Sequence, residues 1–279
     1  MSRYQTWNFV HDGTPHIYYN VMNIIKVVIV MSKDYMGTIT RFKGDKAQWK
    51  RLIHDYDIHK WVCGIERGKD GLYHLQIRIR MRDGDDDKGR GPFDVLKHYF
   101  PQGHFEPCSD TWNYERKDGH FWASDDTNEI RKVRFGSPRG WQKTCVNALR
   151  TQSDRQIDIM YDPVGCMGKS WLVNHLFEIG KAWYVPPYMS TLEKLVQTVA
   201  SLYIKQGWRD YLIIDIPRAY KWSEQLYTAI ESIKDGLIME PRYEAQPVNI
   251  RGVKIVVMCN TLPVLNKLSA DRWRIATLS

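Results

Sequence analysis

Three polar side chains in the first half of the chain have the types and spacing to bind a divalent cation. His74 and Gln76 are separated by one residue in a strand-like segment, so side-chain alternation puts both on one face. Glu66 ends the preceding strand-like segment and adds a carboxylate. Such a set suits Mg²⁺ or Mn²⁺, leaves coordination positions open, and would polarise a scissile phosphate. For His-x-Gln alone, a surface strand with polar residues is the simpler interpretation.

Tyr114 is a candidate nucleophile that follows these residues in the chain. On a helix, residues three apart share a face, so Lys117 would stand beside the Tyr114 hydroxyl. A tyrosine that attacks phosphorus forms a phosphotyrosine and conserves bond energy for rejoining, while the lysine offsets the phosphate charge. With 16 tyrosines and 20 lysines, chance predicts about one Tyr-x-x-Lys match, and the chain contains one. The motif therefore depends on its place after the metal-binding candidates.

A contiguous loop in the second half has the pattern of a phosphate-binding site. Its backbone N–H groups can wrap phosphates, its lysine can neutralise the β- and γ-phosphates of ATP, and its serine can ligate Mg²⁺. Proline stands where G-x-x-x-x-G-K-[ST] has its first glycine, and the glycine two residues later partly replaces it. The loop consists of Asp162, Pro163, Val164, Gly165, Cys166, Met167, Gly168, Lys169 and Ser170.

Three downstream residues strengthen the ATP-binding interpretation. Asp215 ends an apolar strand-like run and would hold the water shell of Mg²⁺. Asn260 ends a second such run and would sense the γ-phosphate or orient the attacking water. Arg272 follows and would reach the nucleotide of a neighbouring subunit. Each feature alone is more often structural, and their order and spacing favour an ATPase.

The general base for ATP hydrolysis is left open by the sequence. Many such ATPases have a second acid after the strand aspartate, and Ile216 occupies that position here. The base is therefore Asp215 itself or a carboxylate from elsewhere, with Glu224 and Glu231 the nearest candidates.

These residues need two domains to position them. Mixed strands and short helices predict an α+β domain at 36–124, with an antiparallel sheet and flanking helices, after a segment 1–35 that we leave unassigned. We expect a linker and an oligomerisation helix at 125–152, and an α/β nucleotide-binding domain at 153–279. The predicted elements are strands at 37–42, 61–66, 72–80, 157–161, 211–215 and 254–259, helices at 45–56, 93–99, 110–117 and 141–151, and a helix from Lys169.

The composition is that of a globular protein. The 279 residues are 43% hydrophobic and 26% charged, and the formal net charge of +8 suits a polyanionic partner such as nucleic acid. Five widely spaced cysteines, with no Cys-x-x-Cys pair, argue against a disulfide framework or a zinc site. No apolar run reaches the roughly 20 residues of a membrane span, and we expect no signal peptide.

With both sites in view, the chain resembles the replication-associated (Rep) proteins of circular single-stranded DNA viruses, which join an HUH-type endonuclease to a superfamily 3 helicase. The segments 37–41, 74–76 and 114–117 are similar to the three nuclease motifs of that family. The loop at 162–170, Asp215 and Asn260 are similar to its helicase motifs. The segments 67–71 and 214–218 look most like the smacovirus branch.

The resemblance implies a function and partners. A Rep nicks single-stranded DNA at an origin stem-loop, stays linked to the 5′ phosphate through tyrosine, and unwinds DNA with ATP during rolling-circle replication. The cofactors would be Mg²⁺ or Mn²⁺, with ATP as substrate. The partners would be further copies in a hexameric ring and the host replication machinery, with no membrane, in the nucleus of a eukaryotic host. The alternatives are a plasmid-type initiator, or a nucleic-acid-binding ATPase with an inactive nicking domain.

Overall fold

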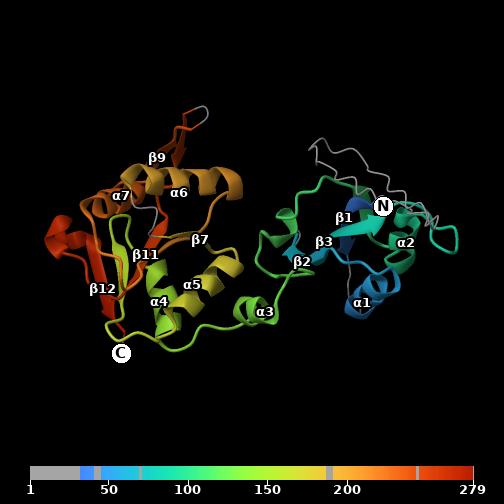
Figure 1. Ribbon diagram of the computed structural model, residues 1–279, viewed down its shortest axis with the longest axis horizontal. Helices are drawn as coiled ribbons and strands as arrows, with labels where there is room; N and C mark the ends of the chain where they lie inside the picture. Colours follow the sequence, from blue (N-terminus) through green and yellow to red (C-terminus); the bar gives the residue numbers. More distant parts are fainter. Residues whose placement is uncertain (1–31, 41–44, 69–70, 187–190, 243–244, 279) are drawn as a thin grey trace, which may run out of the picture.

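The computed structural model describes residues 32–40, 45–68, 71–186, 191–242 and 245–278, which form two lobes (Figure 1). The first lobe holds an antiparallel sheet with strand order β4-β1-β3-β2-β5. Its elements are β1 (Ser32–Thr40), α1 (Asp45–Asp55), β2 (Trp61–Arg67), β3 (Tyr73–Arg82), α2 (Pro92–Tyr99), β4 (His104–Pro107), the 3-10 helix η1 (Tyr114–Arg116) and β5 (Phe121–Ala123).

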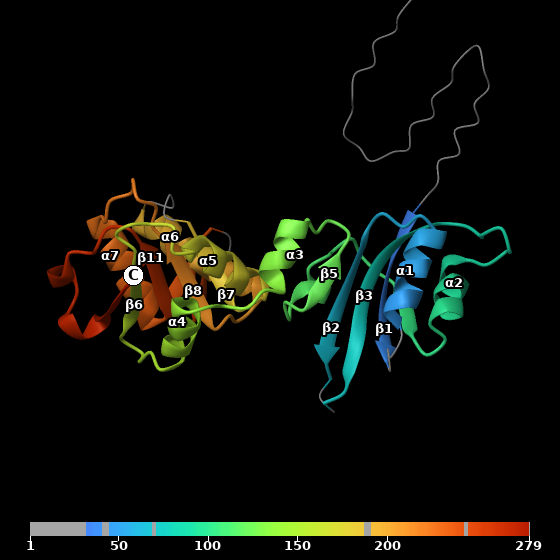
Figure 2. The same cartoon turned by 90° about the horizontal axis from the view of Figure 1, so that it is seen from below.

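Side-chain alternation along β3 makes one face of this sheet apolar and the other polar. Leu75, Ile77 and Ile79 enter the hydrophobic core, to which residues of α1 and α2 also contribute. The place of these two helices beside the sheet can be followed in Figure 2. The intervening side chains, His74, Gln76 and Arg78, rise from the opposite face, as side-chain alternation predicts. The helices therefore cover one face and leave the polar residues on the other.

The second lobe holds a parallel sheet with strand order β12-β6-β11-β8-β7 and a separate β9–β10 hairpin. Its elements are α4 (Trp141–Arg150), β6 (Ile157–Tyr161), α5 (Lys169–Glu178), β7 (Ala182–Val185), α6 (Leu192–Gln206), β8 (Tyr211–Asp215), α7 (Glu224–Asp235), β9 (Leu237–Glu240), β10 (Gln246–Asn249), β11 (Lys254–Cys259), the 3-10 helices η2 (Leu265–Lys267) and η3 (Ala270–Arg272), and β12 (Trp273–Thr277).

The central strands β6, β11 and β8 of this second sheet are mostly apolar, because helices cover both faces of the sheet. In β8, Leu212 and Ile214 pack into a cluster with residues of α6 and α7, whereas Ile213 packs into a cluster with residues of α4 and α5. A mixture of an antiparallel and a parallel sheet is what the sequence predicted. None of the helices in the described part of the chain is long and apolar enough to cross a membrane.

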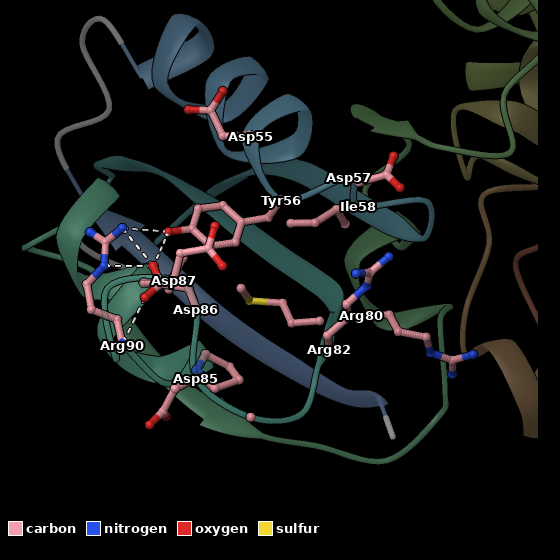
Figure 3. Close-up of a pocket in the computed structure, with 14 residues that line it drawn as sticks. Asp55, Tyr56, Asp57, Ile58, Arg80, Arg82, Asp85, Asp86, Asp87 and Arg90 are labelled. Atoms are coloured by element: carbon pink, nitrogen blue, oxygen red, sulfur yellow. Dashed lines mark hydrogen bonds and ion pairs between the residues drawn. The ribbon is translucent and has the colours of Figure 1, made fainter. Parts of the chain in front are cut away.

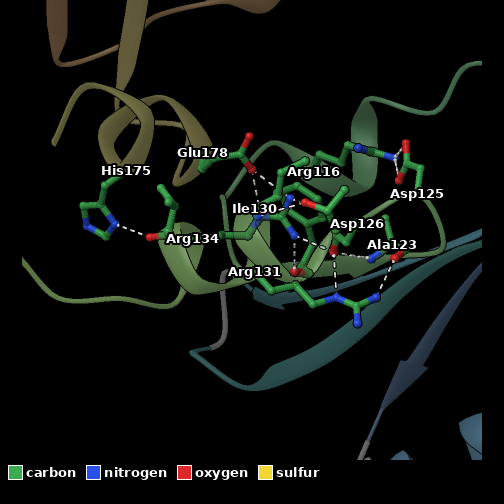
Figure 4. Close-up of polar contacts among 12 residues, drawn as sticks. Arg116, Ala123, Asp125, Asp126, Ile130, Arg131, Arg134, His175 and Glu178 are labelled. Carbon is green, nitrogen blue, oxygen red and sulfur yellow. Dashed lines mark hydrogen bonds and ion pairs between the residues drawn. The ribbon is translucent and has the colours of Figure 1, made fainter. Parts of the chain in front are cut away.

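The segment between the lobes is more ordered than the expected linker. It contains α3 (Asn128–Arg134), and the Arg134 guanidinium donates to both carboxylate oxygens of Asp126 at 2.7 Å. The same guanidinium donates to Glu178 of α5 at 2.7 Å (Figure 4). The Val133 carbonyl oxygen lies 2.9 Å from His175 Nδ1 of α5. These contacts join α3 to the second lobe.

Two elements differ from the sequence prediction. The first strand begins at Ser32, so 32–35 belongs to the sheet, while residues 26–31, whose sequence is also strand-like, lie outside the described residues. The helix α4 lies where it was expected and packs its Cys145 and Leu149 into the second lobe, and its role in oligomerisation stays a prediction. The helix expected at 110–117 is only the short turn η1, and the Ser109 carbonyl before it accepts from Arg78 at 2.6 Å.

Candidate functional site

The strand register brings the metal-binding candidates onto one face of the first sheet. Glu66 of β2 lies opposite His74 of β3, and their Oε2 and Nε2 atoms are 3.8 Å apart. Gln76 lies opposite Thr38 of β1, whose hydroxyl donates to Gln76 Oε1 at 2.8 Å. Thr38 belongs to the first motif of the sequence resemblance, whereas Arg41 of that motif lies outside the described residues.

The environment of Glu66 fits a cation ligand. Its Oε1 atom is buried and accepts no hydrogen bond from any residue within the described ranges. A buried carboxylate oxygen without a donor is costly unless a cation or water satisfies it. No group of three or more His, Cys, Asp and Glu side chains in the described residues is arranged to hold a metal ion, so this set depends on the Gln76 amide as its third donor.

Lys117 connects the candidate nucleophile to this set. Its Nζ atom lies 3.0 Å from Glu66 Oε2 and 3.7 Å from the centroid of the Tyr114 ring, which is half exposed. Burial alone would lower the pKa of Lys117, but hydrogen bonding to Tyr114 and Glu66 raises it above the ordinary value. The ammonium therefore stays charged at neutral pH beside the Tyr114 phenol.

Two residues beneath η1 escaped the sequence analysis. The Arg78 guanidinium Nε lies 3.0 Å from each carboxylate oxygen of Glu115, and both side chains are buried. Gly64 of β2 lies under the same turn, where a Cβ atom would stand 2.3 Å from the Glu115 carbonyl oxygen. Alternation on β3 could have placed Arg78 on the face of His74 and Gln76, but nothing in the sequence pairs it with Glu115.

The loop at 162–170 follows β6 and runs into α5, and two of its hydrogen-bond donors bind a carboxylate within the same loop. The buried Asp162 carboxylate accepts from the Gly165 N–H at 2.6 Å and from Lys169 Nζ at 2.6 Å. Burial alone would raise the pKa of Asp162, but these two bonds lower it overall. Gly165 and Gly168 have φ angles of 101° and 80°, which favour glycine. Lys169, the candidate phosphate ligand, is thus paired with a carboxylate of its own loop.

The downstream candidates lie around this loop. Asn260 Nδ2 donates to the Asp162 carbonyl at 2.6 Å. Burial raises the pKa of Asp215, and the nearby charge of Lys169 opposes that rise. Arg218, three residues after Asp215, donates from Nη2 to the Val164 carbonyl at 2.6 Å, a contact that the sequence analysis missed.

Arg272 forms ion pairs that the sequence did not predict. It is buried, and its Nη2 lies 3.0 Å from Asp235 Oδ1 and 3.1 Å from Glu231 Oε1 of α7. These ion pairs hold Arg272 against α7 of its own chain, and its reach to the nucleotide of a neighbouring subunit stays a prediction. Glu224 pairs with Lys267, so neither candidate glutamate base is a free carboxylate.

A cavity of about 320 Å³ in the first lobe has a structural explanation (Figure 3). Asp86 lines it and accepts from the Tyr56 hydroxyl at 2.7 Å and from Arg90 Nε at 2.9 Å. Asp86 also accepts from the backbone N–H groups of Lys88 and Arg90. These bonds close the charged loop before α2, so Asp86 serves the fold.

Comparisons with known proteins identify viral relatives. The chain is 27% identical to the master replication protein of Banana bunchy top virus, over 79% of the chain and 92% of the relative. It is 29% identical to Para-Rep C6 of Subterranean clover stunt C6 alphasatellite over 60% of the chain, and 30% identical to Para-Rep C7 of Faba bean necrotic yellows C7 alphasatellite over 49%. The matched regions span about half of these two para-Reps.

These similarities confirm the resemblance to Rep proteins of circular single-stranded DNA viruses. No protein-family model matches the chain. A formyltetrahydrofolate deformylase from Pseudomonas putida aligns with 71% of the chain and 64% of its own, at 10% identity and a TM-score of 0.21, which is too low to bear on fold or function.

Proposed function

Because the chain is related to viral Rep proteins, we propose that it initiates rolling-circle replication by nicking single-stranded DNA with Tyr114 and unwinding it with ATP. The first lobe would be an HUH-type endonuclease and the second a P-loop ATPase of the superfamily 3 type. The motifs at 67–71 and 214–218 favour the smacovirus branch. We further propose action as a homo-oligomeric ring with host replication proteins, in the nucleus of a eukaryotic host.

The proposed nicking step is a transfer of one phosphoryl group. The Tyr114 phenol loses its proton and its oxygen forms a bond to phosphorus, the bond from phosphorus to the 3′ oxygen breaks, and that 3′ oxygen takes up a proton. The 5′ phosphate stays on Tyr114, and the free 3′ hydroxyl primes a polymerase. Lys117, 3.7 Å from the ring, would stabilise the charge on the attacked phosphate. After one round of synthesis, a 3′ hydroxyl at the end of the displaced strand attacks the phosphotyrosine, the bond from phosphorus to the Tyr114 oxygen breaks, that oxygen takes up a proton, and the circle is closed.

Glu66, His74 and Gln76 would hold the divalent cation of this reaction. The partnerless oxygen of Glu66 and the imidazole 3.8 Å from its other oxygen are suitable donors for Mg²⁺ or Mn²⁺. When bound, the ion supplies Lewis acidity to a non-bridging phosphate oxygen. The paired strands β2 and β3 would fix the positions of the donor atoms, and Lys117 would orient the Glu66 carboxylate through its 3.0 Å contact.

In the second lobe, we propose that ATP binds at 162–170. Lys169 would leave Asp162 for the phosphates, Ser170 would ligate Mg²⁺, and Asp215 would hold its water shell. Asn260 and Arg218, which both contact this loop, are placed to sense the nucleotide. The general base is Asp215 or a carboxylate that moves into place, because Glu224 and Glu231 are both engaged in ion pairs.

The observation that carries this proposal is the bridge formed by Lys117 between the Tyr114 ring and Glu66. It joins a nucleophile candidate to a cation-binding candidate that is 48 residues away in sequence. The test is denaturing electrophoresis of the full chain with a labelled single-stranded hairpin oligonucleotide, with and without Mn²⁺. We expect a protein–DNA adduct that needs Mn²⁺ and is absent from Tyr114→Phe. An adduct of equal yield in Tyr114→Phe would refute the mechanism, and none in the wild type would favour a DNA-binding ATPase.

A further inference from the structure

A buried ion pair lies directly beneath the turn that carries Tyr114. Arg78 and Glu115 are 4% and 2% exposed, and the Arg78 Nε atom lies 3.0 Å from both carboxylate oxygens of Glu115. Glu115 is the neighbour of Tyr114, and Arg78 follows His74 and Gln76 on the same face of β3. The strand β3 therefore carries two metal-ligand candidates and also Arg78, whose guanidinium group holds the turn that contains Tyr114.

Two further contacts fix the turn to the same strands. Arg78 Nη1 donates to the Ser109 carbonyl at 2.6 Å, so it binds the segment before Tyr114 as well as the residue after it. On β2, Gly64 allows the backbone of η1 to approach, since a Cβ atom there would stand 2.3 Å from the Glu115 carbonyl oxygen. Gly64 is two residues from Glu66, so both sides of the site share one rigid strand pair.

We propose that Arg78 and Glu115 are positioning residues for the nicking reaction, holding η1 so that the Tyr114 phenol faces the cation set. The proposal rests on the proposed function and adds a role for two residues to it. A buried ion pair is costly to desolvate, and apolar residues of similar volume often give equal stability. Its value here is geometric, because a displacement of about 1 Å of a reacting group can cost about 100-fold in rate.

The main test is Glu115→Gln in the full chain, which keeps the shape of the side chain and removes its charge. We measure the rate of adduct formation at saturating hairpin oligonucleotide and Mn²⁺, the oligonucleotide affinity, and the Mn²⁺ concentration for half-maximal rate. The expected result is a rate about 100-fold lower, with affinity and half-maximal Mn²⁺ within about twofold of wild type. A purely structural role would change all three in proportion to the lost fold.

A matched control is available two residues further along β3. Arg80 forms a two-nitrogen fork with the buried Asp34 of β1, with contacts of 2.7 and 2.9 Å, and this fork includes no residue of η1. Arg80 also lies 3.0 Å from Asp110 before η1, and Asp34→Asn leaves both partners of that ion pair in place. Asp34→Asn should lower the melting temperature as Glu115→Gln does and leave the adduct rate within about twofold of wild type. An equal loss of rate in Asp34→Asn would reduce the Arg78–Glu115 effect to general destabilisation and overturn the proposal.

Gly64→Ala provides a second route that leaves both charges in place. Its added methyl group must push η1 away, so we expect a loss of rate of the same order at unchanged Mn²⁺ dependence. If Glu115→Gln fails to fold, the rate of adduct formation by Gly64→Ala alone tests the proposal. A wild-type rate in Gly64→Ala, or in a folded Glu115→Gln, overturns the proposal. Failure of the wild type itself to form an adduct would instead contradict the proposed function.

Discussion

The two candidate sites differ in how the chain assembles them. The nicking site draws Glu66, His74 and Gln76 from two strands that their register brings together, and Tyr114 and Lys117 from a turn that contacts them through the Lys117–Glu66 ion pair. The phosphate loop is one run of nine residues between a strand and a helix. A contiguous motif is visible in a sequence, whereas a dispersed one becomes convincing only when strand pairing is known.

The sites also differ in how their charges are satisfied. In the first lobe, the Glu66 Oε1 atom has no partner among the described residues. In the second lobe, Asp162 already binds Lys169 and the Gly165 N–H. The first site therefore offers a ligand atom directly, while the second must give up an internal ion pair before its lysine reaches a phosphate.

The largest expected effect separates the two sites. Lys169→Ala should reduce ATP hydrolysis by about 100-fold or more, because the variant lacks the cation that neutralises the phosphates. The adduct rate on a single-stranded hairpin should stay within about twofold of wild type, as this substrate needs little unwinding. Phosphate release and denaturing electrophoresis measure the two activities, and Tyr114→Phe should show the opposite pattern. Loss of both activities in Lys169→Ala would contradict independent sites.

A smaller effect is expected when the cation site is weakened. Glu66→Gln keeps the size of the side chain and removes its charge, so half-maximal nicking should need about 10- to 100-fold more Mn²⁺. Glu106→Gln, at an exposed position on β4 of the same sheet, is the control and should behave as wild type. Nicking by Glu66→Gln at wild-type Mn²⁺ concentrations would remove Glu66 from the proposed ligand set.

The sequence predicted the fold better than it predicted the contacts within the sites. The strands at 157–161, 211–215 and 254–259 were predicted with the bounds that the structure has, because buried parallel strands are continuous apolar runs. The helix expected at 110–117 is only a short turn, and the Ser109 carbonyl before it accepts from Arg78, a partner distant in sequence. Likewise, the sequence did not predict that Arg272 pairs with Glu231 and Asp235, because these two residues lie on a helix distant in sequence.

The ion pair between Asp162 and Lys169 within the phosphate loop leads to a prediction about the affinity for ATP, with an expected change of a few-fold. Asp162→Asn keeps an oxygen for the Gly165 N–H and removes the charge that binds Lys169. We expect the Kd for ATP to fall by about three- to tenfold, which corresponds to about 1 kcal/mol. Titration with a fluorescent ATP analogue measures it. Weaker binding by this variant would show that Asp162 supports the nucleotide-binding conformation instead of competing with it.

The smallest expected effect is a pH-dependent change in the free energy of unfolding, and it concerns the second lobe only. Burial, reinforced by the charge of Lys254, lowers the pKa of Lys234 in the second lobe to about 8. Since the unfolded chain binds this proton more tightly, the second lobe should gain about 1 kcal/mol between pH 7 and pH 9. Denaturant unfolding at the two pH values measures the gain. Lys234→Met should lose it, and an equal gain in this variant would assign it to other groups.

The most direct test of the central claim is to locate the attachment site of DNA. The full chain is incubated with the hairpin oligonucleotide and Mn²⁺, digested with nuclease and trypsin, and examined by fragmentation mass spectrometry. The account predicts a phosphonucleotide on Tyr114 in the peptide 98–116, which also contains Tyr99 as an internal comparison. A modification on Tyr99 or on any residue other than Tyr114 would contradict it.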